Sequence, residues 1–142
     1  MRVLNEVISG FGHVNIQATH HSTLEFTRDT HVSRNGDCIL VVSADKAPAD
    51  LSAEFKEALR KPHAQLIITV EAGEVSEQVQ AEGSPHLVLS HPTEMVIRKS
   101  EYASDRTLAV HADKAAKDLS RELVAKLQNP RQTVKITLEV CT

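Results

Sequence analysis

The sequence of 142 residues contains no tryptophan, one tyrosine and three phenylalanines, so aromatic residues make up only 3% of it. Proteins that bind single-stranded nucleic acid usually stack bases on aromatic rings, and this chain offers few. It also lacks a net positive charge, because 16 lysines and arginines stand against 19 aspartates and glutamates. Domains that bind nucleic acid are generally basic, so the composition argues against that class without excluding it.

Cysteine and long apolar runs are also scarce. Cys38 and Cys141 are the only cysteines and have no C-x-x-C partner, a pattern typical of small buried thiols in a reducing cytosol. No run approaches the roughly 18 apolar residues that a membrane-spanning helix needs. The first ten residues contain one basic residue and too short an apolar stretch for a signal peptide. We therefore expect a cytoplasmic protein without membrane segments.

Recognised catalytic loops are missing as well. There is no Walker loop, no G-x-G-x-x-G motif and no serine in the context of a nucleophile elbow. Histidine, by contrast, is plentiful, since eight histidines are many for this length. Imidazoles titrate near neutral pH and bind metal ions, so a histidine-rich chain invites a search for such a site.

The second half of the sequence repeats the first at a shift of 68 residues. Residues 43–71 match residues 111–139 without a gap, with about 13 identities in about 29 positions. The match predicts two tandem repeats, about 1–72 and about 73–142, within a single domain.

Each half is predicted to have the order β-β-β-β-α-β. Apolar residues at helical spacing end at Pro62 and at Pro130, which predicts one helix before each proline. Asn35-Gly36 predicts a tight hairpin, and residues 71–74 predict another between the halves. The expected strands are Val3–Ile8, Val14–Thr19, Leu24–Arg28, Cys38–Val42 and Gln65–Glu71, followed by Val75–Gln80, Leu87–Ser90, Met95–Arg98, Thr107–Val110 and Thr133–Val140.

The core of either half would be small, because each half contains about 70 residues and one helix. The apolar strand 38–42 also needs cover on both faces. We therefore expect a single α+β domain with a pseudo-two-fold axis, in which the sheets pair across the axis, with barrel-like closure as one option, and the helices lie outside. The tight hairpin at 71–74 argues against two separate domains.

His20 and His91 are equivalent in the two repeats, and each continues the apolar face of an expected strand. A two-fold axis would bring them to one mouth of the core as metal ligands or acid–base groups, with His21, Glu25 or Glu94 completing the site. In the structural alternative, each imidazole is hydrogen-bonded to the backbone and holds a turn. No H-x-x-x-H pair on a helix supports a metal site.

The motif Asp45-Lys46-Ala47 recurs as Asp113-Lys114-Ala115 before the second helix. An aspartate at a helix start accepts hydrogen bonds from free backbone N–H groups, which is a structural role. Lys46 and Lys114 would then lie at helix N-termini, where an anion can bind. The two roles are compatible.

Residues 91–107 depart from the repeat in charge. Arg98 stands where the first half has Thr27, and together with Lys99 and Arg106 it gives a basic hairpin. These three side chains are predicted to clamp a phosphate or a carboxylate. In the alternative, the charges only keep strand edges from pairing with other molecules.

Several blocks of the sequence carry a resemblance to a known family. They are GHVNIQATHHSTLEFT, NGDCILVV, HPTEMVIRKS and DRTLAVHADKAAKDLSREL. Through them the chain resembles, over nearly its whole length, a small archaeal family catalogued only as a domain of unknown function. The resemblance implies an archaeal, cytoplasmic source and no mechanism.

The favoured hypothesis is that the protein binds a small anionic ligand, or a divalent metal such as zinc, at the seam between the repeats, with enzymatic activity left open. The alternatives are an RNA-associated module that uses the basic hairpin Arg98–Arg106 and a self-associating structural protein. The candidate metal ligands are His20 and His91, and the candidate ligand-binding residues are Lys46, Lys114, Arg98 and Arg106.

Overall fold

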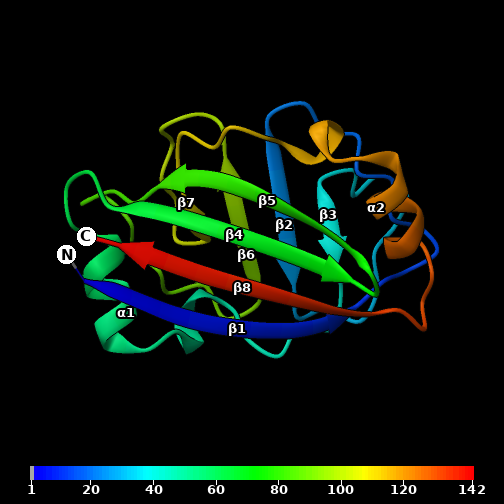
Figure 1. The fold of residues 1–142 in the computed structure, drawn as a ribbon, viewed down its shortest axis with the longest axis horizontal. Coiled ribbons are helices and arrows are strands. Elements are labelled where there is room, and N and C mark those ends of the chain that lie inside the picture. Colours follow the sequence, from blue (N-terminus) through cyan, green and yellow to red (C-terminus); the bar gives the residue numbers. More distant parts are fainter. Residues whose placement is uncertain (1) are drawn as a thin grey trace.

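The computed structural model describes residues 2–142, which form a mixed α+β fold with two four-stranded sheets and two α-helices (Figure 1). The helices are α1 (Ala53–Leu59) and α2 (Arg121–Leu127), and each follows a short 3₁₀ turn. The strands are β1 (Val3–Phe11), β2 (Thr23–Thr27), β3 (Ile39–Val41), β4 (Gln65–Ala72), β5 (Val75–Glu82), β6 (Glu94–Arg98), β7 (Thr107–Ala109) and β8 (Thr133–Cys141).

The first sheet, sheet A, has the strand order β1-β8-β4-β5 and is antiparallel throughout. The second, sheet B, has the order β3-β2-β6-β7, with an antiparallel central pair and parallel outer strands. Each sheet takes two strands from residues 3–72 and two from residues 75–141, so neither half contains a complete sheet. Among residues 2–142, backbone pairing connects the two sheets only through the isolated bridges Phe11–Val42 and Glu82–Val110. The expectation of barrel-like closure is therefore wrong for residues 2–142.

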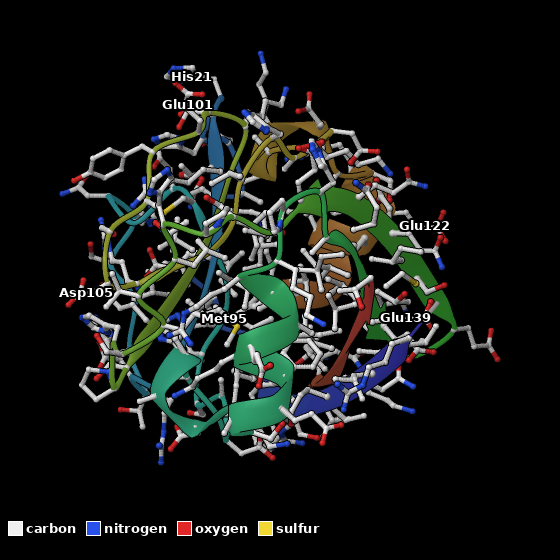
Figure 2. The ribbon with its side chains drawn as sticks, turned by 90° about the vertical axis from the view of Figure 1, so that its left-hand side faces the viewer. His21, Met95, Glu101, Asp105, Glu122 and Glu139 are labelled. Atoms are coloured by element: carbon white, nitrogen blue, oxygen red, sulfur yellow. The ribbon has the colours of Figure 1, made fainter. Side chains whose placement is uncertain are left out.

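The apolar core lies between the two sheets. Figure 2, which looks along the molecule from the α1 end, shows sheet B on one side, sheet A on the other and α1 standing between them. Figure 1 places α1 and α2 at opposite ends of the long axis. Strand alternation turns one face of each sheet inward. The fully buried side chains include Ile8, Leu24, Phe26, Leu66, Met95, Ile97, Ile136 and Leu138.

The helices end before Pro62 and Pro130, as the sequence predicts, but they begin after Ser52 and Ser120 and not at the aspartates expected to start them. Ser52 accepts a hydrogen bond from the N–H of Phe55, and Ser120 accepts one from that of Leu123, so serines cap both helix starts. Each helix buries one apolar stripe against the core, and both end before a proline. Instead of lying outside the sheets, the helices cover the two ends of the core.

Two expected strands do not form. Segments 14–19 and 87–90 are turns and irregular backbone, in which Ala18 and Leu89 have φ angles of 52° and 55°. An extended strand does not accommodate these angles. Ile16 and Leu87 are buried, whereas Val14 and Val88 are exposed. Side chains at the helix ends, and not a neighbouring strand, donate hydrogen bonds to carbonyl groups of both segments. Arg60 donates to the carbonyl oxygens of Leu87 and Val88, and Gln128 donates to that of Ile16.

The hairpin expected at Asn35-Gly36 and the basic hairpin Arg98–Arg106 do not form either. β3 runs parallel to β2, and β7 runs parallel to β6. A parallel neighbour cannot be reached through a tight turn, so residues 28–38 and 99–106 are crossover segments. The only hairpin confirmed is that of β4 and β5, where Gly73 has a φ of 65°. No helix within residues 2–142 has the length and apolar character needed to cross a bilayer.

Candidate functional site

Glu25 lies on the outer face of sheet B and is nevertheless almost completely buried. The alternation along β2 turns Leu24 and Phe26 toward the core and Glu25 away from it. Only 4% of Glu25 is exposed, since residues from both crossover segments contact this face. Among residues 2–142 its carboxylate receives one hydrogen bond, from the Cys38 thiol at 3.6 Å. A buried carboxylate with so few donors is costly in its charged form.

The register of the central strand pair brings two further charged residues to Glu25. Glu25 lies opposite Val96, so Glu94 and Arg98 are its diagonal neighbours on β6. Diagonal neighbours on one sheet face are close enough for long side chains to interact. Two residues of β6 that are four positions apart in sequence therefore flank the same buried carboxyl group.

Arg106 connects the two carboxyl groups. Its Nη1 atom donates to Oε1 and Oε2 of Glu94 at 3.2 Å and 3.1 Å and lies 3.8 Å from Oε1 of Glu25. One guanidinium group thus serves two carboxylates. Burial, together with repulsion from Glu94, outweighs the attraction of Arg106 and raises the pKa of Glu25 to about 7.

Arg98 has no carboxylate partner within 4.0 Å in the described chain, residues 2–142. Its Nε atom donates to Oγ1 of Thr107 at 2.9 Å, and its Nη2 atom donates to Oγ of Ser104 at 3.4 Å. The guanidinium carbon lies 5.0 Å from the ring centre of Tyr102, within the range of a cation–π contact. Burial and the nearby Arg106 lower the pKa of Arg98 below its ordinary value, yet a guanidinium group stays charged near neutral pH.

Cys38 is a neutral member of this group. Burial and the charge of Glu25 raise the pKa of its thiol to about 11. At neutral pH it is therefore a weak hydrogen-bond donor, since only a thiolate acts as a nucleophile or a strong metal ligand.

Glu25, Glu94, Arg98 and Arg106 together are called the seam cluster below, because β2 and β6 come from the two halves of the chain. Two guanidinium groups can hold an oxyanion with several charge-assisted hydrogen bonds. A carboxyl group with a pKa near 7 can give or take a proton at neutral pH. The cluster therefore combines the elements needed to bind an anion and to move a proton beside it.

His20 and His91 are not brought together. β2 and β6 are antiparallel, and Thr23 pairs with Arg98 while Thr27 pairs with Glu94. The histidines precede opposite ends of this pair, separated by at least the length of β2, about 13 Å at the usual rise per residue. In each ring Nδ1 accepts backbone N–H groups of the following turn, from Ser22 and Thr23 and from Thr93 and Glu94 respectively. These are the contacts of the structural alternative.

Lys46 and Lys114 each face a glutamate. Nζ of Lys46 lies 2.9 Å from Oε1 of Glu6, and Nζ of Lys114 lies 3.1 Å from Oε2 of Glu77. The preceding aspartates do not cap helices, because Asp45 accepts from the N–H of Ser9 and Asp113 accepts from that of Gln80, both on edge strands. The two lysines are therefore engaged in pairs that tie sheet edges to helix starts.

Among the candidate ligand-binding residues, only Arg98 and Arg106 share one site. Lys99 instead pairs with Asp118 at 2.7 Å. Sequence reasoning considered Glu25 and Glu94 only as companions of the histidines and missed their contact with the arginines. The available signal was a charged residue between two apolar ones in the middle of a short strand.

Two surface hollows lie away from the seam cluster. The larger, of about 730 Å³, is on the outer face of sheet A between β1 and β8 and includes Val7 and Phe11. The smaller, of about 430 Å³, includes three histidines and two glutamates: His63, His86, His111, Glu82 and Glu101. Within residues 2–142, no group of three or more histidine, cysteine, aspartate or glutamate side chains is arranged to hold a metal ion. Neither hollow includes a residue of the seam cluster.

Comparison with known proteins places the chain in a family. A family model described as a domain of unknown function, DUF371, matches residues 8–141. An uncharacterized protein from Methanocaldococcus jannaschii is 42% identical over 128 residues, which cover 90% of this chain and 94% of that protein. The resemblance to an archaeal family of unknown function is thereby confirmed, and the chain belongs to the DUF371 family.

Proposed function

We propose that the protein binds a small anionic ligand at the seam cluster, where Arg98 holds the anion, Arg106 lies beside it in its pair with Glu94, and Glu25 is the neighbouring proton donor or acceptor. The observation that carries the proposal is the guanidinium group of Arg98, which is partly buried beside a second guanidinium group and has no carboxylate oxygen within 4.0 Å among residues 2–142. Like charges placed together in a partly dry environment are unfavourable, and an oxyanion between them would offset this cost.

The chemistry of the ligand follows from the donors. The guanidinium fork of arginine matches the geometry of a carboxylate or a phosphate oxygen pair. The Thr107 and Ser104 hydroxyl groups hold the Nε and Nη2 atoms of Arg98, while its Nη1 atom has no hydrogen-bond acceptor among residues 2–142. A small oxyanion on this free edge would also lie close to Arg106.

The RNA-associated alternative is less well supported. Lys99 is paired with Asp118, and Arg106 is paired with Glu94, so two of the three cations of segment 98–106 already have carboxylate partners. Phosphate contacts to nucleic acid need cations that face solvent. For the self-associating alternative, no contact of the described chain favours one surface over another.

Calorimetric titration at pH 6 and low salt tests the proposal, with sulfate, phosphate and acetate as probes. We expect Arg98→Gln to weaken binding by about tenfold or more, because it removes a charge-assisted donor. The control is Arg2→Gln, which removes the same charge from an exposed pair with Glu54. Circular dichroism checks that both variants fold. Equal affinities of the wild type and Arg98→Gln, or no binding of any probe, would refute the site.

We further propose that the chain arose by duplication of one unit and that its halves are related by a pseudo-two-fold axis between β2 and β6 and between β4 and β8. The order β-β-β-α-β occurs in both halves. If β1 is equivalent to β5, β4 to β8, β2 to β6 and β3 to β7, each sheet has the same order of equivalent strands when it is followed from either edge. Specific details also recur, such as the positive φ angles of Ser43 and His111 and the lysine–glutamate pairs at Lys46 and Lys114.

A circular permutant tests the equivalence of the halves. The ends of β1 and β8 lie side by side, since the backbone groups of Arg2 and Thr142 exchange two hydrogen bonds. On the proposed axis, this junction is the counterpart of the turn at Gly73. A chain opened after Gly73, with Thr142 joined to Arg2 by a two-residue turn, is expected to unfold cooperatively within a few degrees of the wild type. Loss of cooperative unfolding would contradict the proposed equivalence.

A further inference from the structure

We propose that the seam cluster takes up one proton with each anion that it binds, so that its ligand is a weak acid admitted as a singly charged oxyanion together with a proton. This inference rests on the anion binding proposed above and specifies the charge of the ligand. It is carried by the arrangement of four charged side chains on one covered sheet face.

The charge of the cluster depends on Glu25. When Glu25 and Glu94 are both ionised, they balance Arg98 and Arg106, and the cluster has no net charge to attract an anion. When Glu25 holds a proton, one positive charge remains. It resides at Arg98, because Glu94 occupies Arg106 through both of its carboxylate oxygens. The protonated cluster is therefore the form that suits one negative charge.

Glu25, and not Glu94, is the group that takes the proton. The Glu94 side chain is 29% exposed and receives two hydrogen bonds from Arg106, whereas that of Glu25 is 5% exposed and lies 3.8 Å from the same cation. Hydration and charge-assisted bonds favour the ionised form of a carboxyl group, and burial favours the neutral form.

The groups facing Glu25 come from three sides. β6 contributes Glu94 and Arg98, the segment before β7 contributes Arg106, and the segment before β3 contributes Cys38. Farther out, His91 lies 3.8 Å from Glu94, Tyr102 lies on Arg98, and Asp37 lies near Cys38. Because burial raises the pKa of Glu25 to about 7, this carboxyl group can hold or release its proton near neutral pH before a ligand arrives.

An anion on Arg98 adds a negative charge beside Glu25 and further favours its neutral form. By linkage, the effect is reciprocal: the proton strengthens anion binding by the same factor by which the anion strengthens proton binding. In the pH range between the pKa of Glu25 in the free protein and its higher pKa in the complex, each bound anion therefore brings up to one proton from solution.

The test is calorimetric titration with acetate and with methanesulfonate, which stay ionised between pH 6 and pH 9. We expect the affinity of the wild type to be nearly constant near pH 6 and to fall by about tenfold per pH unit well above pH 7. Titrations at pH 8.5 in buffers of different ionisation enthalpy are expected to give close to one proton taken up per anion.

Glu25→Gln mimics the neutral carboxyl group and is expected to bind both probes with an affinity that does not change with pH. Glu54→Gln is the control, because it changes the exposed ion pair of Glu54 with Arg2, outside the seam cluster. This variant is expected to keep the wild-type pH dependence. In the wild type itself, saturating acetate is expected to move the NMR titration midpoint of the Glu25 carboxyl carbon to higher pH, a readout that needs no variant.

Wild-type binding that is independent of pH, or an equal pH dependence in Glu25→Gln, would overturn the proton coupling and leave the anion site in place. Absence of binding of both probes at every pH would instead overturn the anion site, so the two failures are distinguishable.

Discussion

Replacement of Gly83 by alanine is expected to lower the free energy of unfolding by about 3 kcal/mol or more. A Cβ atom at this position would lie 2.0 Å from the carbonyl oxygen of Leu59 and 2.9 Å from its carbonyl carbon. Both are backbone atoms at the end of α1. The Leu59 oxygen accepts the N–H of Ser84, and the N–H of Gly83 donates to Ala64, so neither side can move without losing a hydrogen bond.

Urea unfolding of three glycine variants measures this effect. Gly12→Ala is expected to cost about as much, because its Cβ would lie 2.3 Å from the oxygen of Leu127 at the end of α2. Gly73→Ala is the matched control. Nothing lies closer than 3.8 Å to its added Cβ, and the cost of its φ of 65° is about 1 kcal/mol. A Gly83→Ala protein as stable as Gly73→Ala would contradict the close approach of β5 to the helix end.

The second large effect concerns Glu25 and pH. The folded-state pKa of about 7 exceeds the ordinary value of 4.5, so folding favours the neutral carboxyl group. The stability that this group contributes is fully present below pH 4.5 and is lost as the pH rises through 7. A shift of this size corresponds to about 3 kcal/mol. We expect the wild type to lose this amount relative to Glu25→Gln between pH 4.5 and pH 8.

Other carboxyl groups act in the opposite sense and must be separated from Glu25. Burial alone would raise the pKa of Glu6, but hydrogen bonds from Ser52 and Lys46 hold this pKa below its usual value. Hydrogen bonds from Lys99 and Ala115 likewise lower the pKa of Asp118. Their contribution to stability is present above their ordinary pKa and is lost as the pH falls. Because both proteins contain these groups, the difference between the two stability curves isolates Glu25. Parallel curves would contradict the raised pKa of Glu25.

Much of the fold was predictable because its signals are local. Apolar and polar residues alternate, or apolar residues follow one another, in the strands β1, β4, β5 and β8. Apolar residues at helical spacing precede Pro62 and Pro130, and Gly73 marks a tight turn. These patterns depend on residues close together in sequence. The α+β class follows from them directly.

The errors arose where distant partners decide the structure. The apolar alternation around Ile16 and Leu87 is that of a strand, but helix-end side chains of Gln128 and Arg60 take the backbone bonds that a neighbouring strand would take. Asn35-Gly36 favours a hairpin locally, yet β3 pairs in parallel with β2. Neither outcome is encoded within a short window.

The candidate site was predictable in part. In the proposed repeats Arg98 stands where the first half has Thr27, which drew attention to the segment that contributes to the seam cluster, and Arg106 was named with it. The burial of Glu25 was not predictable, because strand alternation alone assigns this side chain to an exposed face. Residues of the crossover segments, Cys38 and Arg106, contact Glu25 on that face, and these segments follow from the parallel pairing of β3 and β7.

Carbon-detected NMR titration of the glutamate side chains, with and without saturating acetate, tests the seam cluster most directly. We expect one carboxyl group, assigned to Glu25, with a midpoint near pH 7 that moves to higher pH when acetate is bound. Glutamate midpoints that all lie below about pH 5 and do not respond to acetate would contradict it.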